Sequence, residues 1–199
     1  METHSVGTLL TDLALIAGLI VLASFFVAAE IALISLRDSQ VREIATRGKR
    51  GARVAALAAH PNRLLAAVQI GVTVSGFLSA ALGADQLGDY VIPWLESLGI
   101  SNAWSTTISL LGVTLVIAYF SLVFGELVPK RVALFRAEEI AMATAGIINV
   151  VANIFRPLIW LLSKSTDIVL RAFGIDPKEG DFSRVSINYC FNTVAYIVK

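Results

Sequence analysis

The chain has 199 residues, of which 56% are hydrophobic and 16% are charged, and its mean hydropathy is +0.76. This composition excludes an ordinary soluble domain and indicates a helical membrane protein. The formal net charge of +1 indicates no nucleic-acid or other polyanionic partner, and the single cysteine, Cys190, excludes an internal disulfide.

The first predicted membrane span covers about residues 11–36, an apolar run that only Glu30 interrupts after Asp12. At 1.5 Å per residue, a helix of this length crosses about 30 Å of hydrocarbon. No lysine or arginine precedes the run, unlike in a cleavable secretory signal. We therefore expect this helix to remain in the mature protein.

A basic segment follows at residues 37–63, where arginine and lysine clearly outnumber the acidic residues. By the positive-inside rule, this segment is predicted to face the cytoplasm. Gly48 and Gly51 separate two short helical patterns, and Pro61 closes the second. We expect two short helices here, at the cytoplasmic surface.

The second and third predicted spans cover about residues 62–84 and 103–128. The connection between them holds acidic residues and no basic ones, and Lys130 and Arg131 follow the third span. Three crossings with the N-terminus outside and the C-terminus in the cytoplasm satisfy these charges. The sequence thus predicts a multi-pass protein of the cell membrane, either the inner or the plasma membrane.

The region after the third span is open to two interpretations. Residues 140–155 are apolar but short for a crossing, and Arg156 and Pro157 follow at once. A kinked fourth crossing is one interpretation. A juxtamembrane helix over about residues 137–173, lying at the cytoplasmic interface, fits the short apolar blocks better. Residues 1–175 then form one transmembrane domain, and residues 176–199 are a linker or truncated tail with no assignment.

The stretch VFGELVPK holds the strongest candidate for a functional site. Pro129 has no N–H to donate, so the carbonyl of Gly125 loses its helical partner one residue before the Glu126 carboxylate. An unpaired polar group inside a membrane is costly, and Mg²⁺ prefers oxygen ligands. In the alternative interpretation, Pro129 only ends the helix and Glu126 pairs with Lys130 one turn away.

The second span adds small and hydroxyl-bearing residues. A stripe of small residues with a spacing of four allows another helix to approach closely; it consists of Gly71, Ser75, Ser79 and Gly83. Thr73 and Gly76 lie on a neighbouring face. We predict that the hydroxyls of Thr73 or Ser75 point toward Glu126, with helix packing alone as the alternative.

The first span contributes Ser24 and Glu30. Glu30 lies near the cytoplasmic end, where it is either part of a cation relay or a structural ion pair with a loop arginine. His4 and His60 lie outside the spans, and neither a phosphate-binding loop nor a nucleophile motif occurs. We therefore do not expect an enzyme.

Three stretches together resemble the transmembrane domain of the CorC/CNNM magnesium transporters, also called hemolysin-C-like proteins. They are FFVAAEIALISL, QIGVTVSG and VFGELVPKRVAL, and the resemblance covers about residues 8–175. It implies an all-α homodimer of three-helix protomers with a juxtamembrane helix that belts the dimer. It also implies Mg²⁺ export coupled to Na⁺, with a dehydrated Mg²⁺ held between the three helices.

The resemblance also implies the ligands. In the family, oxygens of the first two helices and the glycine and glutamate of a GE-x-x-P motif hold the ion. Many relatives read S-A-x-F-S where this chain keeps only Ser24, so a backbone carbonyl near Ala23 or Ser24 is an alternative to a side-chain ligand on the first helix. Some relatives have an asparagine where this chain has Val72. The resulting prediction lists the ligands Ser24, Thr73, Ser75, Gly125 and Glu126, with Glu30, Gly76 and Pro129 as structural support.

Relatives usually continue into paired CBS regulatory domains, which we expect in the full-length protein and which these 199 residues do not include. A function of another class is also open at this point. The domain could be a non-transporting anchor and dimerisation scaffold for a cytoplasmic regulatory domain, with Glu126 as a structural partner of Lys130.

Overall fold

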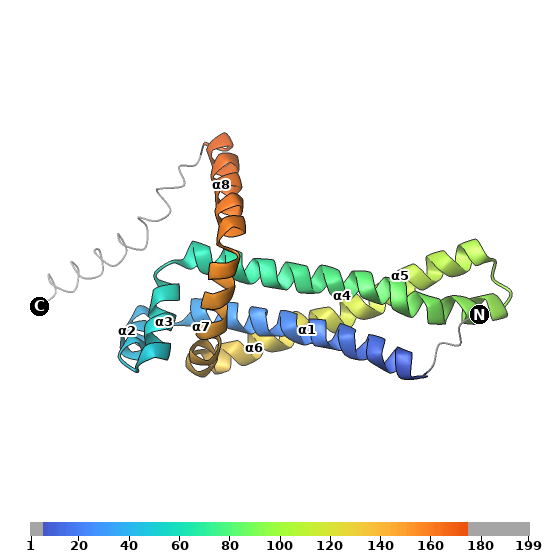
Figure 1. Cartoon of the computed structure of the whole chain (residues 1–199), viewed down its shortest axis with the longest axis horizontal. Helices are drawn as coiled ribbons and strands as arrows, with labels where there is room; N and C mark the ends of the chain where they lie inside the picture. Colours follow the sequence, from blue (N-terminus) through green and yellow to red (C-terminus); the bar gives the residue numbers. More distant parts are fainter. Residues whose placement is uncertain (1–5, 175–199) are drawn as a thin grey trace, which may run out of the picture. The chain divides into compact units, whose positions relative to one another are not determined.

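The computed structural model describes residues 6–174, and every regular element in this range is helical. The predicted all-α class is therefore confirmed (Figure 1). The elements in chain order are α1 (Val6–Ser35), α2 (Asp38–Ala45), α3 (Lys49–Ala58), α4 (Pro61–Ser97), α5 (Asn102–Phe120), the π-helix η1 (Ser121–Leu127), α6 (Val128–Phe135), α7 (Ala137–Ile154) and α8 (Arg156–Ala172).

Within the described residues, four helical segments are long and apolar enough to cross a membrane: Gly7–Ser35, Pro61–Ser97, Asn102–Phe135 and Ala137–Ile154. Large apolar side chains on these segments are exposed, including Phe77 at 74% and Leu115 at 69%. Lipid is the natural environment for such surfaces. The chain is thus a multi-pass membrane protein, while the number of crossings, three or four, and the orientation of the termini stay predictions.

The long helices α1, α4 and α5 run alongside one another, and α2, α3 and α7 gather at one end of α1 (Figure 1). A buried core forms at that end, where α1 meets α2, α3, α4, α6 and α7. It includes Phe26, Ala29, Ala32, Leu33, Leu36, Ile44, Val54, Leu57, Leu64, Val68, Ala133, Ala141, Ala145 and Ile148. A second, smaller cluster of Ile16, Val113 and Ile117 joins α1 to α5.

The small-residue stripe of α4 packs against other helices of the same chain. A Cβ on Gly71 would lie 2.6 Å from ring atoms of Phe26 on α1, and a Cβ on Gly83 would overlap the Ile117 side chain of α5. Ser75 and Ser79 between them are buried. The close approach that the spacing predicted is therefore made to α1 and α5.

Two short helices follow α1, as predicted. Gly48 joins them in the left-handed region at φ +86°, where a residue without a Cβ is favoured. Gly51 is buried, and a Cβ there would overlap the carbonyl oxygen of Ile44. Pro61 differs from the prediction, because it occupies the first turn of α4 instead of closing α3. Its missing N–H is harmless at that position.

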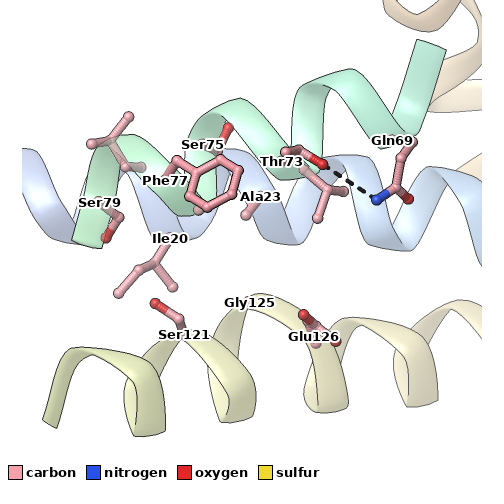
Figure 2. A pocket seen from close by; sticks show the side chains of 13 residues that line it. Ile20, Ala23, Gln69, Thr73, Ser75, Phe77, Ser79, Ser121, Gly125 and Glu126 are labelled. Atoms are coloured by element: carbon pink, nitrogen blue, oxygen red, sulfur yellow. Dashed lines mark hydrogen bonds between the residues drawn. The ribbon is translucent and has the colours of Figure 1, made fainter. Parts of the chain in front are cut away.

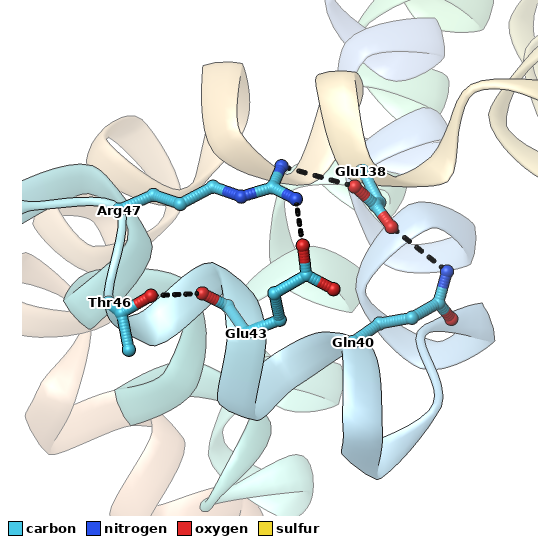
Figure 3. A network of polar contacts seen from close by, with 5 residues as sticks. All are labelled: Gln40, Glu43, Thr46, Arg47 and Glu138. Atoms are coloured by element: carbon cyan, nitrogen blue, oxygen red, sulfur yellow. Dashed lines mark hydrogen bonds and ion pairs between the residues drawn. The ribbon is translucent and has the colours of Figure 1, made fainter.

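A polar network joins α2 to the start of α7 (Figure 3). Glu138 accepts hydrogen bonds from Gln40 Nε2 at 3.0 Å and from Arg47 Nη1 at 3.3 Å. Arg47 also donates to Glu43 at 2.6 Å, and this hydrogen bond and the Glu43 charge raise the pKa of the guanidinium. The basic segment is thereby joined to α7 through the carboxylate of Glu138.

Two helix boundaries differ from the sequence prediction. The helix α4 continues beyond the predicted end of the span at residue 84 as far as Ser97. It is held there because Ser109 Oγ of α5 donates to the Gly88 carbonyl at 3.3 Å. The segment 137–173 is two helices rather than one, with a break at Phe155. Pro157 fits the break, because it has no N–H to donate to the Asn153 carbonyl four residues back and its ring crowds that carbonyl.

Candidate cation-binding pocket

The third long segment does not end at Pro129. It widens into the π-helix η1 over Ser121–Leu127, and the Val128 N–H donates to the Val123 carbonyl five residues back. The α-helix then resumes as α6, with Pro129 in its first turn. The interpretation in which Pro129 only ends the helix is therefore wrong, whereas the pairing of Glu126 with Lys130 that belonged to it is confirmed.

The π-helix follows from the chemistry of proline. Without an N–H, residue 129 can donate neither to the carbonyl of Gly125, four residues back, nor to that of Phe124, five residues back. The wider π-helical turn accommodates the missing N–H of Pro129 without breaking the helix. Such π segments occur frequently at functional sites. It places Gly125 and Glu126 on the side of the helix that faces a pocket.

The pocket lies between α1, α4 and η1 and has a volume of about 430 Å³ (Figure 2). Three elements far apart in the sequence line it. Its lining residues are Leu19, Ile20 and Ala23 of α1, Gln69, Val72, Thr73, Ser75, Gly76, Phe77 and Ser79 of α4, and Ser121, Gly125 and Glu126 of η1.

The structure brings together four of the five predicted ligands, Thr73, Ser75, Gly125 and Glu126, around this pocket. The fifth, Ser24, is half-buried on α1 and does not line it. On the first helix, Ala23 lines the pocket instead. The side chains of α1 that reach the pocket are thus apolar, and its oxygen atoms come mainly from α4 and η1.

The three predicted supporting residues lie in different places. Gly76 lines the pocket, and a Cβ on it would meet nothing within 4 Å. Pro129 is buried in α6 and does not line the pocket. Glu30 is half-buried on α1, where it interacts electrostatically with both Lys130 and Glu126. Glu30 therefore acts on the pocket through charge and does not line it.

Three polar residues of the pocket were missing from the predicted ligands. Ser79 lies one turn beyond Ser75 in the stripe, and Gln69 lies one turn before Thr73, to whose Oγ1 its Nε2 donates at 3.3 Å. Ser121 lies one turn before Gly125. The spacing of four was visible in the sequence for all three, but nothing in it showed which face of each helix turned toward the others.

The hydroxyl of Ser79 is the least satisfied polar group of this pocket. Its residue is 1% exposed, and its Oγ has no hydrogen-bond partner among the described residues. A buried polar atom without a partner costs about 1–3 kcal/mol. This oxygen is therefore available to a cation or a water molecule in the pocket.

The charge of the pocket comes from one carboxylate. Glu126 Oε2 lies 3.1 Å from the Nζ of Lys130, and both side chains are about two-fifths exposed, at 43% and 42%. The described residues contain no group of three or more histidine, cysteine, aspartate or glutamate side chains that could hold a metal. A cation in this pocket would therefore be bound mostly by neutral oxygens.

Comparison with known proteins places the chain in a family. Residues 14–188 match the family described as the cyclin M (CNNM) transmembrane N-terminal domain. A UPF0053 protein of Synechocystis, sll0260, is 41% identical over 169 residues, which are 84% of this chain and 38% of the relative. The UPF0053 protein YhdP of Bacillus subtilis is 32% identical over 168 residues, with the same coverage of 84% and 38%.

A third relative has a name that states an activity. The polyamine export protein of Haemophilus influenzae is 31% identical over 176 residues, which are 87% of this chain and 39% of the relative. The chain thus spans less than half the length of these relatives. The family resemblance predicted from the three sequence motifs is confirmed.

Proposed function

Because the chain belongs to the family of cyclin M transmembrane N-terminal domains, we propose that it is the membrane part of a cation transporter whose cargo is Mg²⁺. The pocket between α1, α4 and η1 is the place where the ion binds during transport. The observation that carries this proposal is the convergence of the Glu126 carboxylate with hydroxyl oxygens of α4 at a π-helical turn.

The donor atoms suit a hard divalent cation. The side-chain donors are a carboxylate, the hydroxyls of serine and threonine, and an amide oxygen, with no nitrogen or sulfur ligand among the lining residues. Mg²⁺ prefers such oxygens in an octahedral arrangement and gives up its water reluctantly. A pocket of about 430 Å³ has room for the ion together with part of its water shell.

A single carboxylate also suits a site that must release its ion. One formal negative charge and several neutral oxygens bind a divalent cation more weakly than a cluster of carboxylates does. Irregular helices that line a cavity within the membrane are a recurring way to build such transport sites. Export as the direction, coupling to Na⁺, the homodimer and the CBS domains are parts of the proposal that rest on the family resemblance.

A polyamine is a second candidate cargo. The name of the Haemophilus relative supports it, and so does the pocket, whose apolar side chains include Leu19, Ile20 and Phe77. An alkyl chain would pack on these residues while an ammonium group paired with Glu126. Lys130 already makes a contact of this kind, because its own alkylammonium group lies on that carboxylate.

The scaffold function is supported by the same ion pair. If Glu126 serves only to hold Lys130, then removing either partner should destabilise the protein to the same extent. This alternative predicts that Lys130→Ala and Glu126→Ala are equally damaging and that neither changes the binding of a cation.

The test is cation binding and transport by the purified chain. Mg²⁺ binding is measured by isothermal titration calorimetry in detergent, and Mg²⁺ flux is measured with a fluorescent indicator in lipid vesicles. We expect Glu126→Gln and Glu126→Ala to abolish measurable binding and flux. The matched control is Glu139→Gln, which removes an exposed carboxylate of α7 and should change neither.

Competition identifies the cargo. If Mg²⁺ is the cargo, spermidine should bind weakly and should not be transported by the wild-type chain. Tighter binding of spermidine, lost in Glu126→Gln, would transfer the proposal to polyamines. Unchanged binding of both cations in folded Glu126→Gln and Glu126→Ala would refute a transport site at this pocket.

A further inference from the structure

A second pocket lies between α3 and α7, at the end of the molecule where the basic segment folds back on the membrane helices. Its volume is about 630 Å³. It shares no residue with the first pocket. Its lining residues are Arg50, Arg53, Met142, Ala143, Gly146, Ile147, Asn149 and Val150.

The pocket carries positive charge that the described part of the chain does not neutralise. Arg50 and Arg53 are three residues apart, so they share one face of α3. Neither guanidinium has a hydrogen bond or an ion pair within residues 6–174, whereas Arg47 pairs with Glu43 and Glu138 (Figure 3). No acidic residue of the described chain lines the pocket. Two arginines therefore present their donors to a ligand from outside the chain.

The α7 wall of the pocket is mostly apolar. Ile147 is 52% exposed and Val150 is 55% exposed, and both belong to a helix apolar enough to lie in a membrane. Asn149 adds an amide beside them. The pocket thus combines positive charge on α3 with exposed hydrocarbon on α7.

Gly146 shapes the contact between the two walls. A Cβ on this residue would lie 3.4 Å from Nη1 of Arg53, so the guanidinium rests close to the backbone of α7. A larger side chain at residue 146 would occupy the space beside Arg53 and push the guanidinium away. The absence of a side chain here keeps the pocket open.

We propose that this pocket binds an anionic phospholipid. The phosphate pairs with Arg50 and Arg53, the amide of Asn149 contributes a hydrogen bond to the headgroup, and an acyl chain packs on Ile147 and Val150. Arginine binds phosphate oxygens with two parallel hydrogen bonds, and basic pockets between membrane helices are known sites for anionic headgroups. A free phosphate ion would use the arginines but would leave the apolar wall exposed to water.

The experiment is native mass spectrometry of the purified full chain in detergent, titrated with phosphatidylglycerol or with phosphatidylcholine. We expect the wild-type chain to retain phosphatidylglycerol in preference to phosphatidylcholine. The double variant Arg50→Gln/Arg53→Gln should bind phosphatidylglycerol roughly thirtyfold more weakly. The matched control Arg42→Gln/Arg131→Gln removes two exposed arginines outside the pocket and should keep the wild-type affinity.

A second variant keeps both charges and removes the space. Gly146→Leu should lose phosphatidylglycerol binding while its circular dichroism spectrum stays that of the wild type. Glu126→Gln should bind the lipid normally, because Glu126 belongs to the other pocket. The proposal of a lipid site and the proposal of a transport site are therefore tested independently.

Three results would overturn the proposal. Equal losses in the double variant and in its control would show that only net charge matters. Inorganic phosphate that binds as tightly as phosphatidylglycerol would identify a site for the free ion. Full retention of the lipid by Gly146→Leu would show that the lipid binds elsewhere on the chain.

Discussion

Lys130 places its ammonium nitrogen 3.1 Å from a carboxylate oxygen of Glu126, which is the only charged residue among residues 6–174 to line the pocket between α1, α4 and η1. The two residues are one helical turn apart, on either side of the junction between η1 and α6. Lys130 is thus a tethered cation at the carboxylate that the proposed cargo must reach. An ion that binds Glu126 competes with Lys130 for the charge of the same carboxylate.

Replacing Lys130 tests this competition. Lys130→Gln should raise the affinity for Mg²⁺ by up to about fivefold, because a partly exposed ion pair of this kind contributes at most about 1 kcal/mol. Isothermal titration calorimetry measures the change, with Arg131→Gln as the control for loss of one neighbouring positive charge. Equal losses of thermal stability in Lys130→Gln and Glu126→Ala, with unchanged Mg²⁺ binding in both, would favour the scaffold function.

Ser79 and Ser109 form a matched pair of buried hydroxyls. Ser79 Oγ has no partner in the described chain, whereas Ser109 Oγ donates to the Gly88 carbonyl. Ser79→Ala should leave the thermal stability unchanged or raise it by up to about 1 kcal/mol, and should weaken Mg²⁺ binding roughly tenfold. Ser109→Ala should cost about 0.5–1.5 kcal/mol and leave Mg²⁺ binding unchanged.

Thermal unfolding in detergent and calorimetry with Mg²⁺ give the two readouts for this pair. Loss of stability in Ser79→Ala with unchanged binding would mean that its hydroxyl has a structural role and no contact with the cargo.

Pro129 is predicted to maintain the π-helical turn. Pro129→Ala restores an N–H four residues after Gly125, so the segment can return to a regular α-helix and rotate Gly125 and Glu126 relative to the pocket. We expect Mg²⁺ binding to weaken roughly ten- to hundredfold, as for other changes that reorient ligands of a metal. Pro93→Ala is the control, because Pro93 lies exposed inside α4 and away from the pocket.

Hydrogen exchange at the new amide of residue 129 shows whether the α-helical bond has formed. If this amide is protected and Mg²⁺ binds as in the wild type, then the π-helical turn is not needed for the site.

Gly71 tests how closely α4 and α1 must approach. Gly71→Ala brings a methyl group to within 2.6 Å of the Phe26 ring and should cost about 1–3 kcal/mol of stability through overpacking. Gly112→Ala in α5 is the control, since a Cβ there meets nothing within 4 Å and alanine is the better helix former. Thermal unfolding in detergent compares them, and equal stabilities would contradict the contact.

The predicted pocket residues follow from interactions within about one turn of the chain, whereas the missed ones depend on how distant helices pack. Gly125 and Glu126 could be predicted because a proline acts on the carbonyls just before it, within the same turn of chain. Thr73 and Ser75 could be predicted as a nearby hydroxyl-bearing face. Ser24 was chosen as a polar residue of the first span and became a predicted ligand through the resemblance, whereas the rotation of α1 brings Ala23 to the pocket.

The sequence by itself determined the helical membrane class, the basic segment after the first helix, the family and the local defect at Pro129, because each depends on composition or on neighbours within about one turn. The tertiary structure decided which helix faces meet. It turned a predicted helix end into a π-helix, added Gln69, Ser79 and Ser121 to the pocket, and set Arg53 of α3 against Gly146 of α7. Contacts between residues so far apart in the sequence depend on how whole helices pack. The residue pattern of one helix does not show how the neighbouring helix is rotated about its axis.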